Sequence, residues 1–327
     1  MKVWPFNKLL ISVAAVASVA LAGVTTTAQA EKFPSKPIRI IVPYGAGGGS
    51  DYLVRKLSDK LSQRLGQTVI VENRPGADGI IGTNMVARAA PDGYTYLVAV
   101  GTHLLNPLVH KNLPYDTFTD LTGVTLIARS PLLFSANEAI AAKDMKDFVA
   151  LSRANPGKYS IANSEKFTMM LVKMLADSQK MDIVHVPYKG SGPLLVDAAG
   201  GAVSIASSSI AAAIPYLKSK RLHPLAVTGL ERSSALPEVP TLKELGLGDF
   251  DYYVTYGLYA PANTPRAALE RMRQEVKAVT SDPEMKTALA SQAAEPVANG
   301  VDEFNADQAE YFQRIKALAA KFNITPE

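Results

Sequence analysis

Residues Val42–Leu57 read VPYGAGGGSDYLVRKL, and this stretch decides the fold. It passes from an apolar run, through four glycines in five residues, into a segment with helical spacing of leucine and valine. Glycines leave backbone N–H groups uncovered, and the helix that follows adds a positive dipole end, so such a turn suits an anion. The stretch predicts an α/β fold with an anion site after its first strand. An ordinary βα turn without a ligand stays the alternative.

The same loop lacks the residues that nucleotide-binding loops need. A dinucleotide loop requires a third glycine, where this chain has Ser50, and a P-loop ends in Gly-Lys-Ser/Thr, where this chain has Gly49-Ser50-Asp51. A carboxylate therefore fits the loop better than a nucleotide. Ser50 or Asp51 is expected to cap the helix. Asp51, being negative, is expected to cap or to orient the loop rather than to touch an anion.

Strand and helix patterns alternate outward from this loop. Strands are predicted over 38–43, 68–73 and 94–100, and helices over 51–65 and 80–90. This βαβαβ order implies a parallel sheet with right-handed crossovers. The opening loop then lies at the carboxyl end of a strand, where open parallel sheets bind ligands.

The same alternation returns in the middle of the chain, where a helix is predicted over 166–178, and the C-terminal part is mostly helical. We therefore expect two α/β lobes with a cleft between them. The first lobe is expected to contain residues 31–130 plus 251–327 with the C-terminal helices, and the second lobe residues 131–250.

The N-terminus has the pattern of a secretory signal peptide. Lys2 and Lys8 precede an apolar stretch over 9–24, and the small-residue triplet Ala28-Gln29-Ala30 follows. We expect residues 1–30 to be removed by cleavage after Ala30, so that the mature protein is exported without membrane insertion. An uncleaved membrane anchor is the alternative, but the stretch is short for a membrane span.

Composition excludes several classes of function. The chain has no cysteine, so neither a disulfide nor a catalytic thiol is available. Removing the signal peptide lowers the formal net charge from +4 to +2, and no basic cluster predicts a nucleic-acid partner. None of the four histidines stands in a metal-ligand pattern, so neither a metal nor a cofactor is expected. His103 and His185 lie near strand ends, so an exported hydrolase or isomerase remains an alternative function.

The chain resembles the Bug-type periplasmic solute-binding receptors of tripartite tricarboxylate transporters. The resemblance covers almost all of the mature sequence and includes DIVHVPYKGSGPLLVDAAGG and LAVTGLERSSALPEVPTLKELG besides the opening segment. It implies a periplasmic location and a type II-like, two-lobed periplasmic binding protein fold, each lobe a mainly parallel sheet flanked by helices, that closes over a small carboxylate. It also implies a monomer without enzymatic activity whose partners are transporter membrane subunits, or alternatively a sensory kinase.

The resemblance further implies ligand-binding residues in both lobes. They are Tyr44, Ala46, Gly47, Gly48, Ser50, Asp51, Ala77, Asp78, Thr102, His103, Asn163, Ser164, Phe167, Tyr188 and Lys189.

The chain departs from the family pattern in the second lobe. ANSEKFTMM, residues 162–170, carries Glu165 and Lys166 in a loop that is usually rich in glycine and serine, and Ser204 stands where an aspartate is common. We expect these departures to decide which carboxylate is bound, with Phe167 and Met169 making this side of the cleft more apolar than usual.

Overall fold

A computed structural model describes Met1, residues 33–164 and 166–322, and Pro326. The predicted signal peptide and its cleavage site therefore lie outside the described residues. The chain divides into two units, Met1–Ser35 and Lys36–Glu327, and every described helix and strand lies in the second unit. Among the described residues, no helix is both long enough and apolar enough to cross a membrane.

The strands of this unit form one mixed sheet. They are β1 Ile38–Val42, β2 Val69–Asn73, β3 Thr95–Val100, β4 Leu121–Asn137, β5 Ser160–Asn163, β6 Val184–Pro187, β7 Ile205–Ser209, β8 Leu222–Val227, β9 Tyr253–Pro261 and β10 Glu295–Pro296. The main path runs β2-β1-β3-β9-β4-β7-β5-β6, and β8 and β10 also pair with β4.

Strand direction divides the sheet into two parallel groups joined by antiparallel strands. β1 pairs in parallel with β2 and β3, and β5 pairs in parallel with β6 and β7. Between these groups, β9 and β4 run antiparallel to their neighbours and to each other. The structure thus contains the expected parallel groups and adds two antiparallel strands that the sequence pattern does not reveal.

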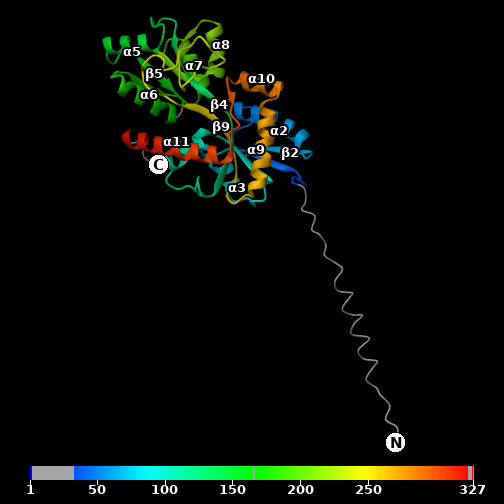
Figure 1. The fold of residues 1–327 in the computed structure, drawn as a ribbon. Helices are drawn as coiled ribbons and strands as arrows, with labels where there is room; N and C mark the ends of the chain where they lie inside the picture. Colours follow the sequence, from blue (N-terminus) through cyan, green and yellow to red (C-terminus); the bar gives the residue numbers. More distant parts are fainter. Residues whose placement is uncertain (2–32, 165, 323–325, 327) are drawn as a thin grey trace. The chain divides into compact units, whose positions relative to one another are not determined.

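Helices surround each parallel group (Figure 1). α5 to α8 lie around β5 and its neighbours, α2 and α3 lie around β1 and its neighbours, and α9 and α11 pack against β4. The helices are α2 Gly49–Leu65, α3 Ile80–Ala87, α4 Asn106–Val109, α5 Met145–Ala154, α6 Lys166–Ser178, α7 Ser191–Ala199, α8 Ile210–Lys218, α9 Arg266–Thr280, α10 Pro283–Ser291 and α11 Val301–Lys321, with 3₁₀ turns at Ala77–Gly79 and Gly101–Leu105.

Strand β1 is a fixed, buried strand, and the glycine-rich loop begins at its end. Four of its five side chains are fully buried, and only Arg39 is exposed, where it pairs with Glu72 at 2.8 Å. A strand buried on both faces is typical of a parallel sheet covered by helices. At the far end of α2, Gly66 adopts a left-handed conformation with φ 67° and donates to Ser62 O, as expected for a glycine C-cap.

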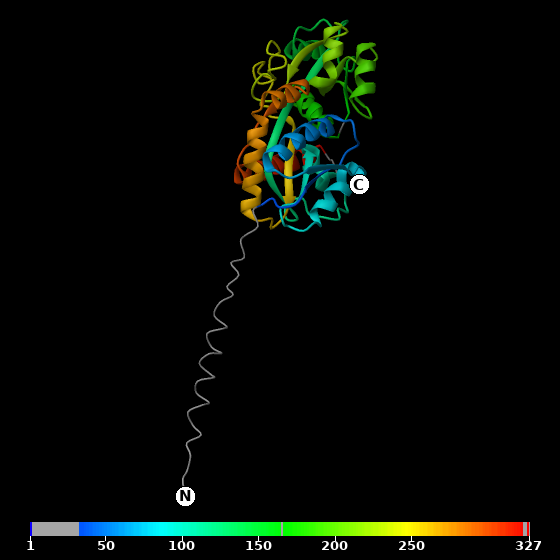
Figure 2. The ribbon, with the colours of Figure 1, turned by 90° about the vertical axis from the view of Figure 1, so that its right-hand side faces the viewer.

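Strand β4 carries the chain from one parallel group to the other (Figure 2). Its first part pairs with β9 as far as Pro131, and its last part pairs with β7 from Leu132 onward. The buried hydroxyl of Thr228 accepts a hydrogen bond from Leu132 N at 2.9 Å and donates one to Tyr252 O at 2.5 Å. One side chain therefore ties β4, where it changes partners, to the residue that directly precedes β9. The division into two lobes that move against each other stays a prediction.

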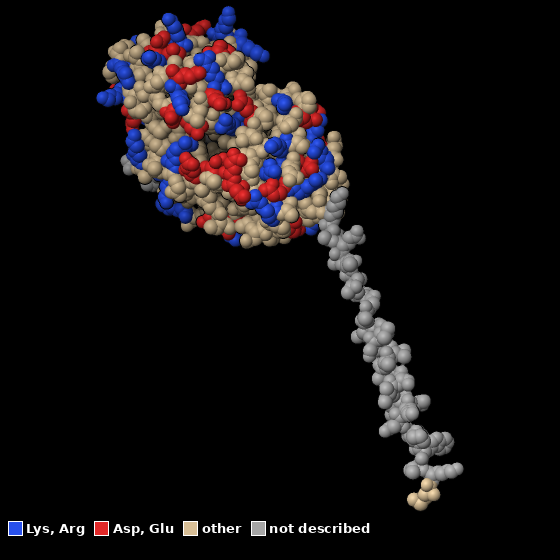
Figure 3. Space-filling model, in the orientation of Figure 1, with Lys and Arg blue, Asp and Glu red and all other residues tan. Residues whose placement is uncertain are grey.

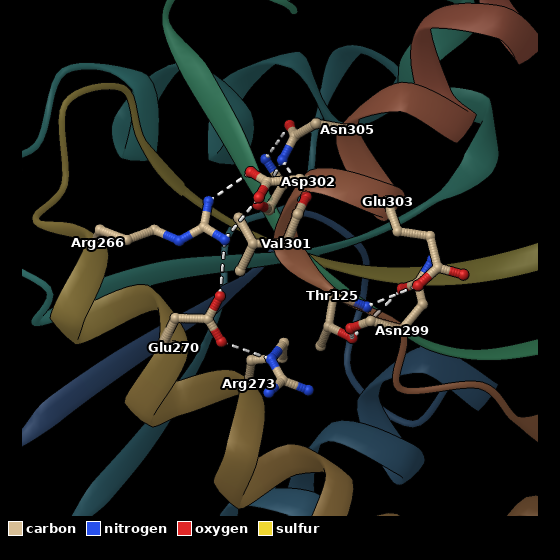
Figure 4. Close-up of polar contacts among 11 residues, drawn as sticks. Thr125, Arg266, Glu270, Arg273, Asn299, Val301, Asp302, Glu303 and Asn305 are labelled. Atoms are coloured by element: carbon tan, nitrogen blue, oxygen red, sulfur yellow. Dashed lines mark hydrogen bonds and ion pairs between the residues drawn. The ribbon is translucent and has the colours of Figure 1, made fainter.

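Helix α11 is attached to β4 by two asparagines (Figure 4). Asn305 exchanges two hydrogen bonds of 2.9 Å with the backbone of Gly123, and Asn299 Oδ1 accepts one from Leu126 N at 2.9 Å. Arg266 of α9 forms an ion pair with the first turn of α11. These contacts fix α11 beside the connecting strands, where its side chains reach two of the cavities of the molecule.

Candidate functional site

The glycine-rich loop joins β1 to α2 at the carboxyl end of a central parallel strand. Gly48 is the N-cap of α2 and provides no side-chain hydrogen bond to the first turn. The expectation that Ser50 or Asp51 caps the helix is therefore wrong. Both residues lie inside the first turn, because α2 begins at Gly49, whereas a capping side chain must precede it.

Asp51 holds the loop instead. Its carboxylate accepts hydrogen bonds from Gly47 N at 2.9 Å, from Arg55 Nε at 3.1 Å and from Asn73 Nδ2 at 2.9 Å, and the residue is 5% exposed. Burial acts to raise the pKa of Asp51, but the hydrogen bonds from Arg55, Gly47 and Asn73 outweigh it and lower this pKa below its ordinary value. The Asp51 carboxylate is therefore engaged with donors of the loop itself, which agrees with the expected orienting role.

Tyr44 connects the loop to the neighbouring strand. Its hydroxyl accepts a hydrogen bond from Val100 N at 3.2 Å, and its carbonyl oxygen accepts one from Asn73 Nδ2 at 3.2 Å. The carboxyl ends of β1 and β3 are thereby held together. Thr102 and His103 follow directly in the 3₁₀ turn after β3.

A mouth cavity of about 600 Å³ lies between this loop and the start of α8. Its lining combines small residues of the loop with residues from α8, β9 and the end of α10. They are Gly47, Gly48, Gly49, Ser50, Tyr52, Ser209, Ala211, Ala212, Tyr256, Ser291 and Gln292.

An inner cavity of about 200 Å³ shares Ser209 with the mouth cavity. Its lining combines hydroxyl-bearing side chains with three aromatic ones. The residues are Val100, Gly101, Thr102, Leu132, Ser164, Phe167, Thr168, Ser191, Ser207, Ser208, Ser209, Tyr253, Val254 and Tyr311.

Helix N-termini supply the electrostatics of both cavities. α2 begins at the mouth cavity. At the inner cavity, α7 begins at the lining residue Ser191, the N-cap of α8 is the lining residue Ser209, and the first turn of α6 contributes Phe167 to the lining. The N-terminal end of each helix carries a partial positive charge of about half an elementary charge. Among the described lining residues of the two cavities there is no Lys, Arg, Asp or Glu. The surroundings therefore favour an anion that is bound by N–H and O–H donors rather than by an ion pair.

The structure brings only some of the predicted site residues to these cavities. Gly47, Gly48 and Ser50 line the mouth cavity, and Thr102, Ser164 and Phe167 line the inner cavity. The remaining predicted residues line neither cavity: Tyr44, Ala46, Asp51, Ala77, Asp78, His103, Asn163, Tyr188 and Lys189.

Several residues outside the cavities have contacts of their own. Ala77 and Asp78 form an exposed left-handed turn, with φ of 46° and 53°, and the Asp78 carboxylate lies 3.1 Å from the ring of His110. Tyr188 donates to Asp197 at 2.6 Å, and this hydrogen bond raises the pKa of Tyr188. Lys189 is exposed.

The two candidate catalytic histidines lack suitable partners. His103 is 1% exposed, both ring nitrogens are without a hydrogen-bond partner, and its ring meets that of Tyr259 edge-on at 4.6 Å. Burial lowers the pKa of His103 to about 4, so the ring is neutral near pH 7. His185 is half-buried, its Nδ1 also lacks a partner, and burial lowers its pKa. Neither ring has the hydrogen-bonded partner that general-base catalysis requires.

The second-lobe residues that depart from the family pattern lie in different parts of the structure. Phe167 lines the inner cavity, but Met169 lines neither cavity. Ser204 lies just before β7, where it exchanges hydrogen bonds of 3.1 and 3.2 Å with Ser160, whereas the cavities meet the other end of β7. Glu165 lies outside the described residues.

Sequence reasoning missed much of the inner cavity. Ser207, Ser208 and Ser209 end β7, and the run of three serines at a strand end was a signal that could have been used. Tyr253 and Tyr311 come from β9 and α11, whose positions depend on tertiary packing and have no local sequence signal.

A third cavity of about 300 Å³ lies beside α11 and shares Tyr253 and Tyr311 with the inner cavity. Unlike the other two, it is charged. Figure 3 shows acidic side chains gathered near a hollow on this face of the molecule. The charged lining residues are Arg129, Asp251, Asp307, Glu310 and Arg314.

No three described His, Asp or Glu side chains come together as a metal-binding group.

Comparisons with known proteins agree on one group. The family profile described as "Tripartite tricarboxylate transporter family receptor" matches residues 53–324. BugT of Bordetella pertussis is 31% identical over 305 residues, which cover 90% of this chain and 92% of BugT. The structure of the periplasmic binding protein BugD is 28% identical, covers 90% of this chain and 100% of BugD, and has a TM-score of 0.72. An R. palustris protein solved with adipate has the same identity and coverage and a TM-score of 0.77.

Proposed function

Because the chain belongs to the tripartite tricarboxylate transporter receptor family, we propose that it captures a small carboxylate and delivers it to the membrane subunits of such a transporter. The ligand's first carboxylate is received by the glycine-rich loop, in the mouth cavity. The two parallel strand groups act as lobes that close over the ligand and present a joint surface to the transporter. Delivery to a sensory partner uses the same closed form and remains the alternative.

One observation carries this proposal. The first turn of α2 faces an open cavity, its N-cap is a glycine without a side-chain hydrogen bond, and no described charged side chain lines that cavity. A carboxylate there meets backbone N–H donors and the helix dipole without a competing acid. The related R. palustris protein was solved with adipate, a carboxylate, which supports the same class of ligand.

The glycines of this loop differ in the space that surrounds them. A Cβ on Gly49 would lie 2.8 Å from Gln292 Oε1, which lines the same cavity. A Cβ on Gly48 would meet nothing nearer than 3.7 Å, so a larger side chain there enters the cavity without disturbing the loop.

Binding proceeds without chemistry on the ligand. The two histidines of the alternative enzymatic function lack hydrogen-bonded partners, and neither lines the mouth or inner cavity. Export with cleavage after Ala30 places the receptor in the periplasm, where the ligand arrives from outside the cell.

Calorimetry on two loop variants tests the proposal. We first identify co-purifying acids by native mass spectrometry and then titrate the protein with those acids. Gly48→Val is expected to weaken binding by roughly tenfold or more, about 1.4 kcal/mol or more, because the side chain covers the N–H donors. Gly45→Val is the matched control, since Gly45 also has open space but does not line the cavity. Absence of carboxylate binding, or equal effects of both variants, would refute the proposal, and so would conversion of the acid into a product.

A further inference from the structure

We infer that the third cavity, beside α11, is a second ligand site, and that it binds a small zwitterion: an α-amino acid with an apolar side chain. This site is separate from the glycine-rich loop, so the inference goes beyond the proposed function and does not rest on it. The cavity volume of about 300 Å³ is at the lower end of the range of small-molecule sites. Figure 3 shows a hollow with charged side chains around it on this face of the molecule.

Strand β9 separates the third cavity from the mouth cavity. Successive side chains of a strand point to opposite faces of the sheet. Tyr253, Thr255 and Tyr259 line the third cavity, whereas Tyr256 lines the mouth cavity. Arg129 is paired with Thr255 in the ladder between β4 and β9, and directly opposed residues share a face. The two cavities therefore lie on opposite faces of the connecting strands.

Arg129 is the first observation on the chemistry of the third cavity. Its guanidinium lies over the ring of Tyr253 at 4.3 Å, and no carboxylate of the described residues forms an ion pair with it. The other arginine of the lining, Arg314, already has partners. It donates a hydrogen bond to Asp251 O at 3.1 Å, and the Asp251 carboxylate lies 3.9 Å away. A ligand carboxylate would give Arg129 the anionic partner that the described residues do not provide.

Two carboxylates of α11 are the second and independent observation. Asp307 and Glu310 line the same cavity, and neither forms an ion pair with a described lysine or arginine. They are three residues apart, which places them on one side of the helix. Burial and the charges of Glu303 and Glu310 raise the pKa of Asp307, although a hydrogen bond from Asn299 opposes this shift. A ligand ammonium group would relieve the repulsion between these acids.

The remaining lining of the third cavity is largely apolar. Leu104, Tyr259 and Phe304 are buried, and the ring centroids of Tyr259 and Phe304 lie 5.6 Å apart. An apolar side chain of the ligand would cover this surface. A purely cationic ligand would leave Arg129 unpaired, and a purely anionic ligand would leave the two acids of α11 unpaired. Only a ligand that carries both charges and an apolar side chain uses every part of the cavity.

The test removes one charge of the ligand at a time. L-Phenylalanine, N-acetyl-L-phenylalanine, which lacks the ammonium group, and phenethylamine, which lacks the carboxylate, are titrated into the mature protein by calorimetry. Phenylalanine is expected to bind about tenfold or more tightly than either analogue, because each analogue leaves charged groups of the cavity unpaired. This comparison uses the parent protein and does not depend on the folding of a variant.

Arg129→Gln then assigns the carboxylate end of the ligand. It is expected to weaken the binding of phenylalanine about tenfold and to leave that of phenethylamine unchanged, because phenethylamine has no carboxylate to lose a partner. Arg221→Gln is the matched control. Arg221 also lies over a tyrosine ring, that of Tyr216 at 6.0 Å, but it lines none of the three cavities.

Glu310→Gln assigns the ammonium end. It is expected to weaken phenylalanine several-fold while leaving N-acetyl-L-phenylalanine unchanged, because the acetylated ligand has no ammonium group. Glu238→Gln is the control, since it removes another exposed acid that lines none of the three cavities.

Gly48→Val separates this site from the mouth cavity, which could accept the carboxylate of an amino acid. Phenylalanine is expected to bind this variant as tightly as the parent, and loss of binding would assign phenylalanine to the mouth cavity and refute the second site. Absence of phenylalanine binding, an analogue that binds as tightly as phenylalanine, or equal effects of Arg129→Gln and Arg221→Gln would also refute it. None of these outcomes affects the proposed function, which fails only if the glycine-rich loop binds no carboxylic acid.

Discussion

Asp51 lies in the loop that we propose as the anion site, but its carboxylate is bound to the loop itself. A carboxylate beside a carboxylate-binding loop would repel the ligand, but its oxygens are already occupied by Gly47 N, Arg55 and Asn73. From its charge, the sequence predicted that Asp51 either caps the helix or orients the loop, and its contacts agree with the second role only. The partners could not be predicted, because Asn73 comes from the end of β2 and reaches Asp51 only in the folded sheet.

Replacing Asp51 by Asn should weaken the loop without unfolding the protein. The variant loses the charge that strengthens three hydrogen bonds, and hydrogen bonds to charged groups contribute about 1.5–3 kcal/mol each. We expect carboxylate affinity to fall by roughly tenfold and the melting temperature by a few degrees. Asp59→Asn, an exposed acid on the same helix, is the control in calorimetry and thermal unfolding.

The stabilising effect of Asp51 should also depend on pH. Its pKa is lower in the folded protein than in the unfolded chain, so its contribution is present above the unfolded value of about 3.9 and is lost as pH falls through the lower folded value. The difference in melting temperature between parent and Asp51→Asn should therefore be constant near neutral pH and shrink below about pH 4. A difference that persists unchanged into strong acid would contradict the charge-based role.

At the scale of elements, regular periodicity in the sequence predicts helices, whereas the pairing of distant strands leaves no local pattern from which it could be predicted. The pattern predicts α6 with the observed bounds and α2 to within two residues, because their leucines and methionines repeat at helical spacing. It does not reveal β4, a 17-residue strand that contains Arg129 and Pro131 and changes partners midway. No local pattern marks such a strand, because its two parts belong to different surroundings.

For the candidate site too, features with a local sequence signal could be predicted and features that depend on distant pairing could not. The glycine-rich loop is predictable because glycine at a strand-to-helix junction has a direct physical meaning. Tyr188 and Lys189 were expected at the site, yet they line neither the mouth cavity nor the inner cavity. Ser207 faces the inner cavity only because β7 pairs with β4 and ends beside it, and this pairing cannot be derived from local sequence.

The contact between α3 and the loop gives a prediction about packing. A Cβ on Gly82 would lie 2.8 Å from Arg74 O, 2.8 Å from Pro43 Cβ and 2.9 Å from Pro43 Cα, and these atoms cannot move independently. Gly82→Ala should cost about 1–3 kcal/mol of stability, because overpacking must displace the backbone just before the glycine-rich loop. Gly192→Ala, at an open position in α7, should be nearly neutral in the same thermal unfolding experiment. Equal melting temperatures for both variants would show that α3 adapts without strain.

At the scale of the whole unit, the connecting strands decide how the two parallel groups can move. Only β4 and β9 join the groups within the main sheet path, and β4 has separate partners before and after residues 131–132. A bend there would turn one group against the other without breaking either parallel group. This is the expected behaviour of hinge closure, in which a few residues absorb the change in backbone angles.

Thr228 is the residue that should control this bend. Its hydroxyl is buried and bridges Leu132 N, where β4 changes partners, to Tyr252 O, directly before β9. Thr228→Val keeps the shape but leaves two buried backbone groups without their partner, at a cost of about 1–3 kcal/mol for each group. We expect a lower melting temperature by several degrees and a larger radius of gyration without ligand, measured by small-angle X-ray scattering. Saturating ligand should reduce the radius of gyration of both the parent and the variant, because contacts made through the bound ligand hold the two parallel groups together even when the hinge is loosened.

The matched control is Thr117→Val, which removes a buried threonine hydroxyl that has no hydrogen-bond partner and lies outside the connecting strands. It should leave both the melting temperature and the scattering curve close to those of the parent. If Thr228→Val lowers stability but the ligand-free radius stays unchanged, the hydroxyl holds the fold without governing the hinge. The hinge would then lie elsewhere. Removing the Thr228 hydrogen bonds from a hinge at residues 131–132 must change how far the ligand-free protein opens.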